Sequence, residues 1–248
     1  MLDFSIIFIS SLIATALSSM SGGGASVINI PVMLSMGISF PMATAAQKVS
    51  SIFWVLPASY NYLRDRKVDW KFISIFTFLG IIGVYIGTLV VFSINQRTAG
   101  VIVGMIILSL VAYVLLKKDV GLVETRTYSK LRQSVAYIFA PIFGFYEGFF
   151  GSGNGIMISI VTFKTKGFDF VDALGYYYSI AFLWEVVAVV LFVSKGYFSW
   201  PIMIPTVVGS IIGGYIGSRY AKYKGNKFIK MMFAVIGGIL GIKLLFGL

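Results

Sequence analysis

The stretch Ser21-Gly22-Gly23-Gly24-Ala25-Ser26-Val27-Ile28-Asn29-Ile30-Pro31 interrupts an apolar region with three consecutive glycines. Each glycine in a helix costs about 1 kcal/mol relative to alanine, and its backbone is free to turn. A similar break occurs downstream, at Gly151-Ser152-Gly153-Asn154-Gly155-Ile156-Met157-Ile158-Ser159-Ile160. In lipid, irregular backbone survives only where protein buries it or water reaches it. Two such breaks in matching positions of two halves indicate a transporter binding site; the simpler alternative is two turns between helices.

The composition is that of a membrane protein. The chain has 248 residues, of which 58% are hydrophobic and only 12% charged, whereas soluble domains carry about 25% charged residues. The mean hydropathy is +0.92. The apolar runs lie at 4–20, 25–37, 43–63, 72–93, 98–116, 134–150, 155–163, 172–194, 200–218 and 228–247.

The lengths of these runs predict an all-α fold. Since a bilayer-spanning helix needs about 20 apolar residues, we expect about 8–10 transmembrane segments. The runs 25–37 and 155–163 are short for a span, and they follow the glycine breaks. They are half-helices, tilted short spans or the return arms of re-entrant hairpins.

Several functions are excluded by what the sequence lacks. There is no cysteine and no histidine, which removes thiolate nucleophiles, the commonest metal ligand and the commonest general base. We therefore expect no enzyme activity, no catalytic residue, no metal and no cofactor. No phosphate-binding Gly-x-x-x-x-Gly-Lys-Ser/Thr motif is present either. The net charge of +11 comes from Lys and Arg in short loops, a pattern of membrane topology rather than of nucleic-acid binding.

The basic residues predict the orientation in the membrane. Sixteen of the 20 Lys and Arg residues lie in four segments, 64–71, 117–133, 164–171 and 219–230. Cytoplasmic loops are enriched in Lys and Arg, so we expect all four segments on the cytoplasmic side. Each half then crosses the membrane an odd number of times, and both termini face outward.

The two halves resemble each other at a shift of about 130 residues. Ala43 matches Ala173, Trp54 matches Trp184, and the segment 81–87 nearly repeats at 211–217. Loop 64–71 is basic whereas its counterpart 194–200 is not, which predicts an inverted repeat. We expect a first transmembrane repeat over 1–116, a cytoplasmic linker over 117–133 and a second repeat over 134–248. Gly-x-x-x-Gly spacings in 83–87 and 213–217 are typical of close helix packing, and Trp70 and Trp200 of interfacial anchors.

The breaks have the chemistry of an anion site. A helix that starts after a glycine break presents free N–H groups and a partial positive charge. Two such starts, after Gly24 and at Gly155, would form a cradle in the middle of the membrane. The expected substrate-binding residues are Gly22, Gly23, Gly24, Ser26, Asn29, Gln47, Lys48, Ser51, Gly153, Asn154 and Gly155. Alternatively, the polar members of this set only cap the broken helices.

Three ionisable residues lie inside apolar segments. Lys48 shares a helix face with Thr44 and Ser51, and an intramembrane charge indicates a functional site; the alternative is that Lys48 snorkels to the outer interface. Glu147 and Glu185 are candidates for coupling transport to protons. The alternative for each is a structural ion pair, with Lys48 as its partner.

These motifs resemble the TauE/SafE family of sulfite and organosulfur-anion exporters. The resemblance rests on 22–24 with Pro31 and Gly37, on the Val68-Asp69-Trp70 turn, and on their counterparts from Gly148 to Trp200. Asn154, where glycine is expected, and Ile160 depart from the pattern. The resemblance implies a carrier in the cell inner membrane that exports sulfite or an organosulfonate. We expect proton coupling, a small anion and lipid as partners, and leave homo-oligomerisation open. The alternatives are an anion channel, a carrier of a different small anion, and a membrane enzyme or structural protein.

Overall fold

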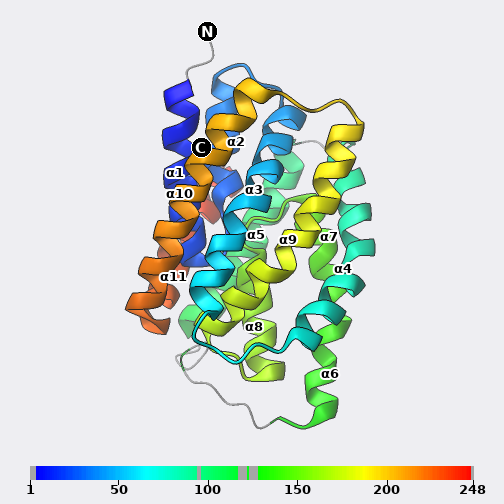
Figure 1. The fold of residues 1–248 in the computed structure, drawn as a ribbon, viewed down its shortest axis with the longest axis vertical. Coiled ribbons are helices and arrows are strands. Elements are labelled where there is room, and N and C mark those ends of the chain that lie inside the picture. The colour runs from blue at the N-terminus through cyan, green and yellow to red at the C-terminus, as the bar shows by residue number, and fades with distance from the viewer. Residues whose placement is uncertain (1–3, 94–95, 117–121, 123–127, 247–248) are drawn as a thin grey trace.

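The computed structural model describes residues 4–93, 96–116, 122 and 128–246, and these form helices without any strand. The fold is therefore all-α, as predicted. The helices are α1 (Phe4–Ser21), α2 (Ala25–Ser35), α3 (Phe40–Leu63), α4 (Trp70–Val91), α5 (Gln96–Leu116), α6 (Lys130–Ile138), α7 (Ala140–Phe149), α8 (Asn154–Lys166), α9 (Phe170–Ser194), α10 (Trp200–Lys224) and α11 (Asn226–Phe246). They run along the long axis of one bundle (Figure 1).

Two helical hairpins with glycine tips enter the bundle from its two ends. α1 runs from one end to the middle, and α2 returns to that end after the break at 22–24 (Figure 1). α6 and α7 run inward from the other end, and α8 returns there, since Arg132 Nε donates to the Lys164 carbonyl at 2.8 Å. The short runs 25–37 and 155–163 are therefore the return arms of hairpins.

The apolar run 134–150 is not one continuous helix. α6 ends at Ile138, and α7 begins at Ala140 with Pro141 in its first turn. Proline lacks the N–H that a helix interior needs but is well tolerated at a helix start. The apolar run 134–150 therefore forms the end of α6 and the whole of α7.

The helix boundaries repeat at the shift found in the sequence. α3 begins at Phe40 and α9 at Phe170, and α4 and α10 begin at Trp70 and Trp200. The two hairpins enter the bundle from opposite ends (Figure 1). The inverted relation of the halves, and the boundaries 1–116 and 134–248 of the two repeats, stay predictions.

The basic segments lie at one end of the bundle, where ion pairs join them. The pairs are Arg66 with Asp169 (3.3 Å) and Asp172 (3.4 Å), Lys166 with Asp69 (3.2 Å), and Lys222 with Asp65 (2.8 Å). This end is the lower one in Figure 1, and α1 begins at the opposite end. Lys117, Lys118 and Arg126 of the expected linker lie outside the described residues. The side of the membrane that this end faces stays a prediction.

Close packing at small residues joins α4 to α7 and α10 to α1. A methyl group on Gly83 would overlap the Pro141 carbonyl, and one on Gly213 would overlap the Leu12 carbonyl. Backbone therefore touches backbone at these positions, as the Gly-x-x-x-Gly spacing predicted.

Alanine at Gly83 and at Gly238 is expected to change stability in opposite directions. At Gly83 the methyl group would also lie 2.6 Å from Phe145 N, and we expect a loss of about 1–3 kcal/mol from overpacking. Gly238 has no atom within 4 Å of an added methyl group, so alanine there is expected to add up to about 1 kcal/mol through helix propensity. Thermal unfolding of both purified variants in detergent checks this, and a stable Gly83→Ala variant would contradict the packing.

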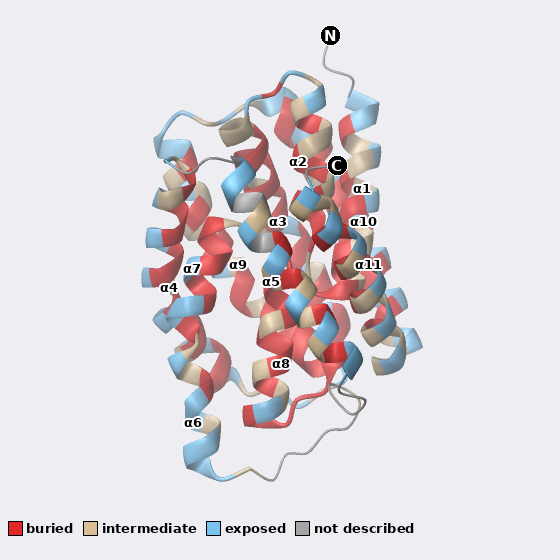
Figure 2. Ribbon diagram, turned by 180° about the vertical axis from the view of Figure 1, so that it is seen from behind, coloured by how far each residue is buried: buried red, intermediate tan, exposed pale blue. Residues whose placement is uncertain are grey.

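The outer surface of the bundle suits lipid. Five helices, α1, α4, α9, α10 and α11, are long and apolar enough to cross a membrane. Exposed residues lie on the outside and buried ones face inward (Figure 2), and the exposed ones include Phe78, Ile82 and Ile86 of α4. Soluble proteins rarely expose such continuous apolar surface. Trp70 and Trp200 are 68% and 65% exposed, as expected of interfacial anchors.

Candidate functional site

The tips of the two hairpins touch each other inside the bundle. A methyl group added to Gly23 would lie 2.5 Å from Gly153 N, and one added to Gly22 would lie 3.2 Å from Ile156 N. Gly22, Gly23 and Gly153 all have positive φ angles of 82°, 134° and 83°, which residues with a side chain rarely adopt. The glycines are therefore required both for the turns and for the contact between them.

A cavity lies beside the tips, between α2, α3, α7 and α9. Its polar and ionisable lining residues are Ser18, Ser26, Thr44, Gln47, Lys48, Ser51, Trp54, Glu147, Ser152, Tyr177 and Glu185. The cavity volume is about 40 Å³. A water-sized group needs about 10–15 Å³ by this measure, so there is room for about three such groups.

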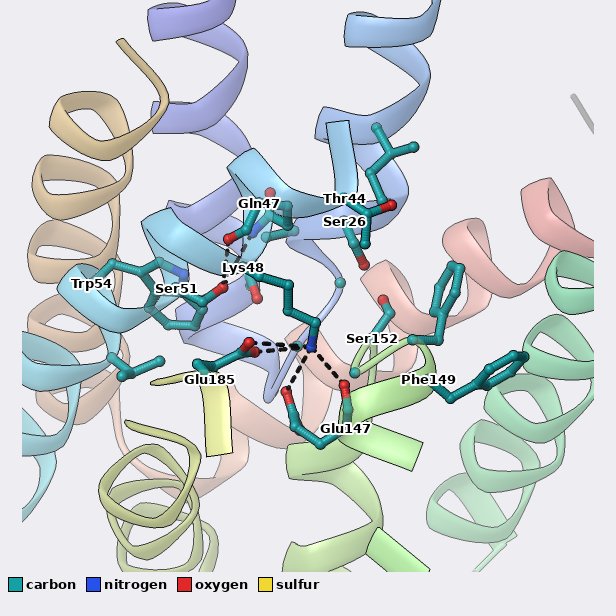
Figure 3. A pocket seen from close by; sticks show the side chains of 18 of the residues that line it. Ser26, Thr44, Gln47, Lys48, Ser51, Trp54, Glu147, Phe149, Ser152 and Glu185 are labelled. Carbon is teal, nitrogen blue, oxygen red and sulfur yellow. Dashed lines mark hydrogen bonds and ion pairs between the residues drawn. The ribbon is translucent and has the colours of Figure 1, made fainter. Parts of the chain in front are cut away.

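Lys48 extends from α3 between two carboxylates (Figure 3). Its Nζ lies 3.2 Å from both carboxylate oxygens of Glu185 and 4.0 Å from Glu147 Oε1. It also donates a hydrogen bond of 2.5 Å to the main-chain carbonyl of Glu147. All three side chains are at most 5% exposed. The alternative that Lys48 snorkels to the interface is wrong, because its charge is paired inside the protein.

The carboxylate of Glu147 is held by neutral donors as well. Asn154 Nδ2 donates to Glu147 Oε2 at 2.6 Å, and the Tyr177 hydroxyl donates to the same oxygen at 3.1 Å. Nearby, the Tyr146 hydroxyl donates to the Ser152 carbonyl at 2.6 Å and supports the second glycine break. Glu147 therefore has a fixed position beside the cavity.

The predicted binding residues divide between the cavity wall and its support. Six of the eleven line the cavity: Gly23, Gly24, Ser26, Gln47, Lys48 and Ser51. Asn29 is fully buried behind the wall, where its Nδ2 donates to Gln47 Oε1 at 2.8 Å. The others, Gly22, Gly153, Asn154 and Gly155, build the hairpin tips and are not among the lining residues.

The start of α2 faces the cavity, whereas the start of α8 does not. Gly24 precedes α2 without a side-chain cap, and Gly24, Ala25 and Ser26 are lining residues. The expected cradle of two helix starts is thus only half present. On the other side, the loop residues Gly151 and Ser152 line the cavity in place of the first turn of α8.

Sequence reasoning did not single out the aromatic and aliphatic part of the wall. These residues are Ile30, Phe40, Val55, Phe149 and Phe150. In an apolar membrane protein such side chains occur at most positions, so no sequence signal distinguishes them. Only the position of residues 149–150, directly before the second glycine break, could have indicated that they lie near the site.

A packed layer separates the cavity from the basic end. Val55 is the last residue of α3 that lines the cavity. One turn further along, the hydroxyl of Ser59 lies 2.5 Å from the hydroxyl of Ser179. Tyr62 stacks on Tyr178 with ring centroids 5.9 Å apart, and both hydroxyls donate to the Ser19 carbonyl. Both tyrosines are fully buried, so this layer closes the bundle on the side of the basic segments.

Fold and site together define a multi-pass helical membrane protein with an ionisable cavity between two broken hairpins. This arrangement belongs to membrane transporters, in which discontinuous helices meet at a central site.

Comparison with known proteins identifies the family. Residues 7–244 match the family described as sulfite exporter TauE/SafE, and the chain belongs to this family of membrane transporters. The chain is 28% identical to a probable membrane transporter protein of Haemophilus influenzae, covering 97% of this chain and 94% of the relative. It is 25% identical to the probable membrane transporter protein YfcA of Escherichia coli K12, covering 97% and 89%. No solved structure matches the chain.

Proposed function

We propose that this protein carries a small sulfur-containing anion, sulfite or an organosulfonate, across the cell inner membrane. The observation that supports this most is the ammonium of Lys48 at the wall of a small cavity that has both polar and apolar lining residues. Across from it stand the hydroxyls of Ser26 and Ser152 (Figure 3) and the start of α2. Oxyanions are rich in acceptors, and these groups supply a charge and the donors to match.

The packed layer supports alternating access rather than a channel. Tyr62 and Tyr178 lie between the cavity and the basic end, where Arg66 pairs with Asp169, so an anion can leave there only after these groups move. A channel would conduct without such a step and without a fixed stoichiometry. The family description names sulfite and export, and both belong to the proposal for this chain; a different small anion is the second candidate.

Flux measurements in proteoliposomes test the substrate class. We expect saturable flux of labelled sulfite, thiosulfate or sulfoacetate, with each anion competing for the transport of the others. Flux that rises linearly with concentration would favour a channel. Absence of flux for all three, with the protein folded and inserted, would overturn the proposed substrate class and leave the transporter family.

Single-cysteine labelling is expected to place the basic end in the cytoplasm. The chain has no native cysteine, so Arg64→Cys at the basic end and Lys195→Cys at the opposite end report without background. In intact cells, an impermeant maleimide should label the second variant and reach the first only after permeabilisation, as basic cytoplasmic loops require. The reverse pattern would invert the proposed orientation.

A further inference from the structure

The buried cluster contains more negative than positive groups. Glu147, Glu185 and Lys48 sum to a charge of −1 when all three are ionised, and each is at most 5% exposed. A further negative charge in this buried site would be costly, and one proton that binds together with a monovalent anion offsets it. The titratable groups around Glu185 are Lys48 from α3, Glu147 from α7 and Tyr177 from its own helix.

The two carboxylates differ in what holds them. Glu147 accepts hydrogen bonds from Asn154 and Tyr177, which remain if Lys48 turns away. Among the described residues, Lys48 is the partner that both oxygens of Glu185 contact, at 3.2 Å. Without Lys48, Glu185 is therefore the carboxylate that needs a proton.

We propose that Glu185 and the transported anion bind Lys48 alternately, and that Glu185 carries one proton while the anion is bound. This inference rests on the proposed anion transport. When the anion enters, the ammonium of Lys48 releases the carboxylate of Glu185 and binds the anion instead. A proton from solvent then binds a carboxylate oxygen of Glu185. When the anion leaves, that proton returns to solvent and Lys48 pairs with Glu185 again. No bond within the anion is made or broken.

Proton and anion then move in the same direction. Each favours binding of the other, because coupling between two ligands is reciprocal. A monovalent anion and one proton together carry no net charge, so the membrane potential does not drive their transport. An inward proton gradient would drive uptake, and export would require a higher concentration of the anion inside. The geometry thus points to symport rather than to exchange of an anion for a proton.

Proton uptake on anion binding tests this inference. The purified protein in weakly buffered detergent solution is titrated with thiosulfate and with sulfoacetate, neither of which buffers near pH 7, while an indicator dye counts protons. We expect about one proton per anion, and an apparent affinity that falls about tenfold per pH unit once Glu185 is ionised. Glu185→Gln is expected to bind the anion with neither proton uptake nor pH dependence.

Asp65→Asn is the matched control, because it makes the same carboxylate-to-amide change at an exposed residue of the basic end and is expected to keep the proton uptake. Anion binding without proton uptake in the wild type would overturn the inference and leave the proposed anion transport intact. So would proton uptake that survives in Glu185→Gln. Absence of binding of either anion to the wild type would contradict both proposals. The wild-type pH series decides the coupling even if one variant does not fold.

Discussion

Lys48→Ala is expected to abolish transport of the small sulfur-containing anions. The substitution removes the one cation that lines the cavity among the described residues. Losing a buried, hydrogen-bonded charge partner lowers affinity by about 2–5 kcal/mol, which is roughly thirtyfold or more. Saturable proteoliposome flux at substrate concentrations near the wild-type half-saturation value measures the effect. Lys195→Ala is the control, because it makes the same change at an exposed turn.

The stability of the Lys48→Ala variant is measured separately from its flux, because the substitution also removes one partner of a buried ion pair. Removing one partner of a buried ion pair costs about 3–5 kcal/mol, and Glu185 would lose the cation that both its oxygens contact. The double variant Lys48→Met with Glu185→Gln removes both charges and is expected to regain much of that stability without regaining flux. Wild-type flux in a folded Lys48→Ala variant would show that Lys48 is a structural partner of Glu185 and not part of the anion site.

Gly23→Ala is expected to destabilise the protein by about 2–6 kcal/mol. The backbone φ of Gly23 is +134°, and a methyl group would lie 2.5 Å from Gly153 N and 3.0 Å from its Cα. A strained backbone conformation costs about 1–3 kcal/mol, and forcing the two tips apart adds about 1–3 kcal/mol. The displaced tip would also move Gly24 and Ser26 in the cavity wall, so flux should fall as well.

Gly37→Ala separates the backbone effect from the contact between the hairpins. Gly37 also has a positive φ, of +80°, but no atom lies within 4 Å of an added methyl group. We therefore expect Gly37→Ala to lose only the stability that backbone strain costs, about 1–3 kcal/mol, and to retain flux. Thermal unfolding in detergent and flux of both variants check this; equal losses for Gly23 and Gly37 would contradict a role for the tip contact.

The sequence by itself determined the all-α membrane fold, the two breaks and the spacing of the helices. These features are local. Apolar runs must become helices because lipid offers no partner to backbone groups, and consecutive glycines weaken a helix wherever they occur. Lys48 was identified for the same reason, since a charge in an apolar helix is conspicuous without any knowledge of its neighbours.

Only the tertiary structure decided how these pieces meet. Lys48 contacts Glu147 and Glu185, which are 99 and 137 residues away in the chain, and no local pattern encodes that pairing. The choice of hairpin return arms for α2 and α8, and the placement of Asn154 behind the cavity rather than in its wall, likewise depend on the packing of distant helices. Side-chain direction around a helix is set by its neighbours, so membership of a site follows from packing and not from residue type.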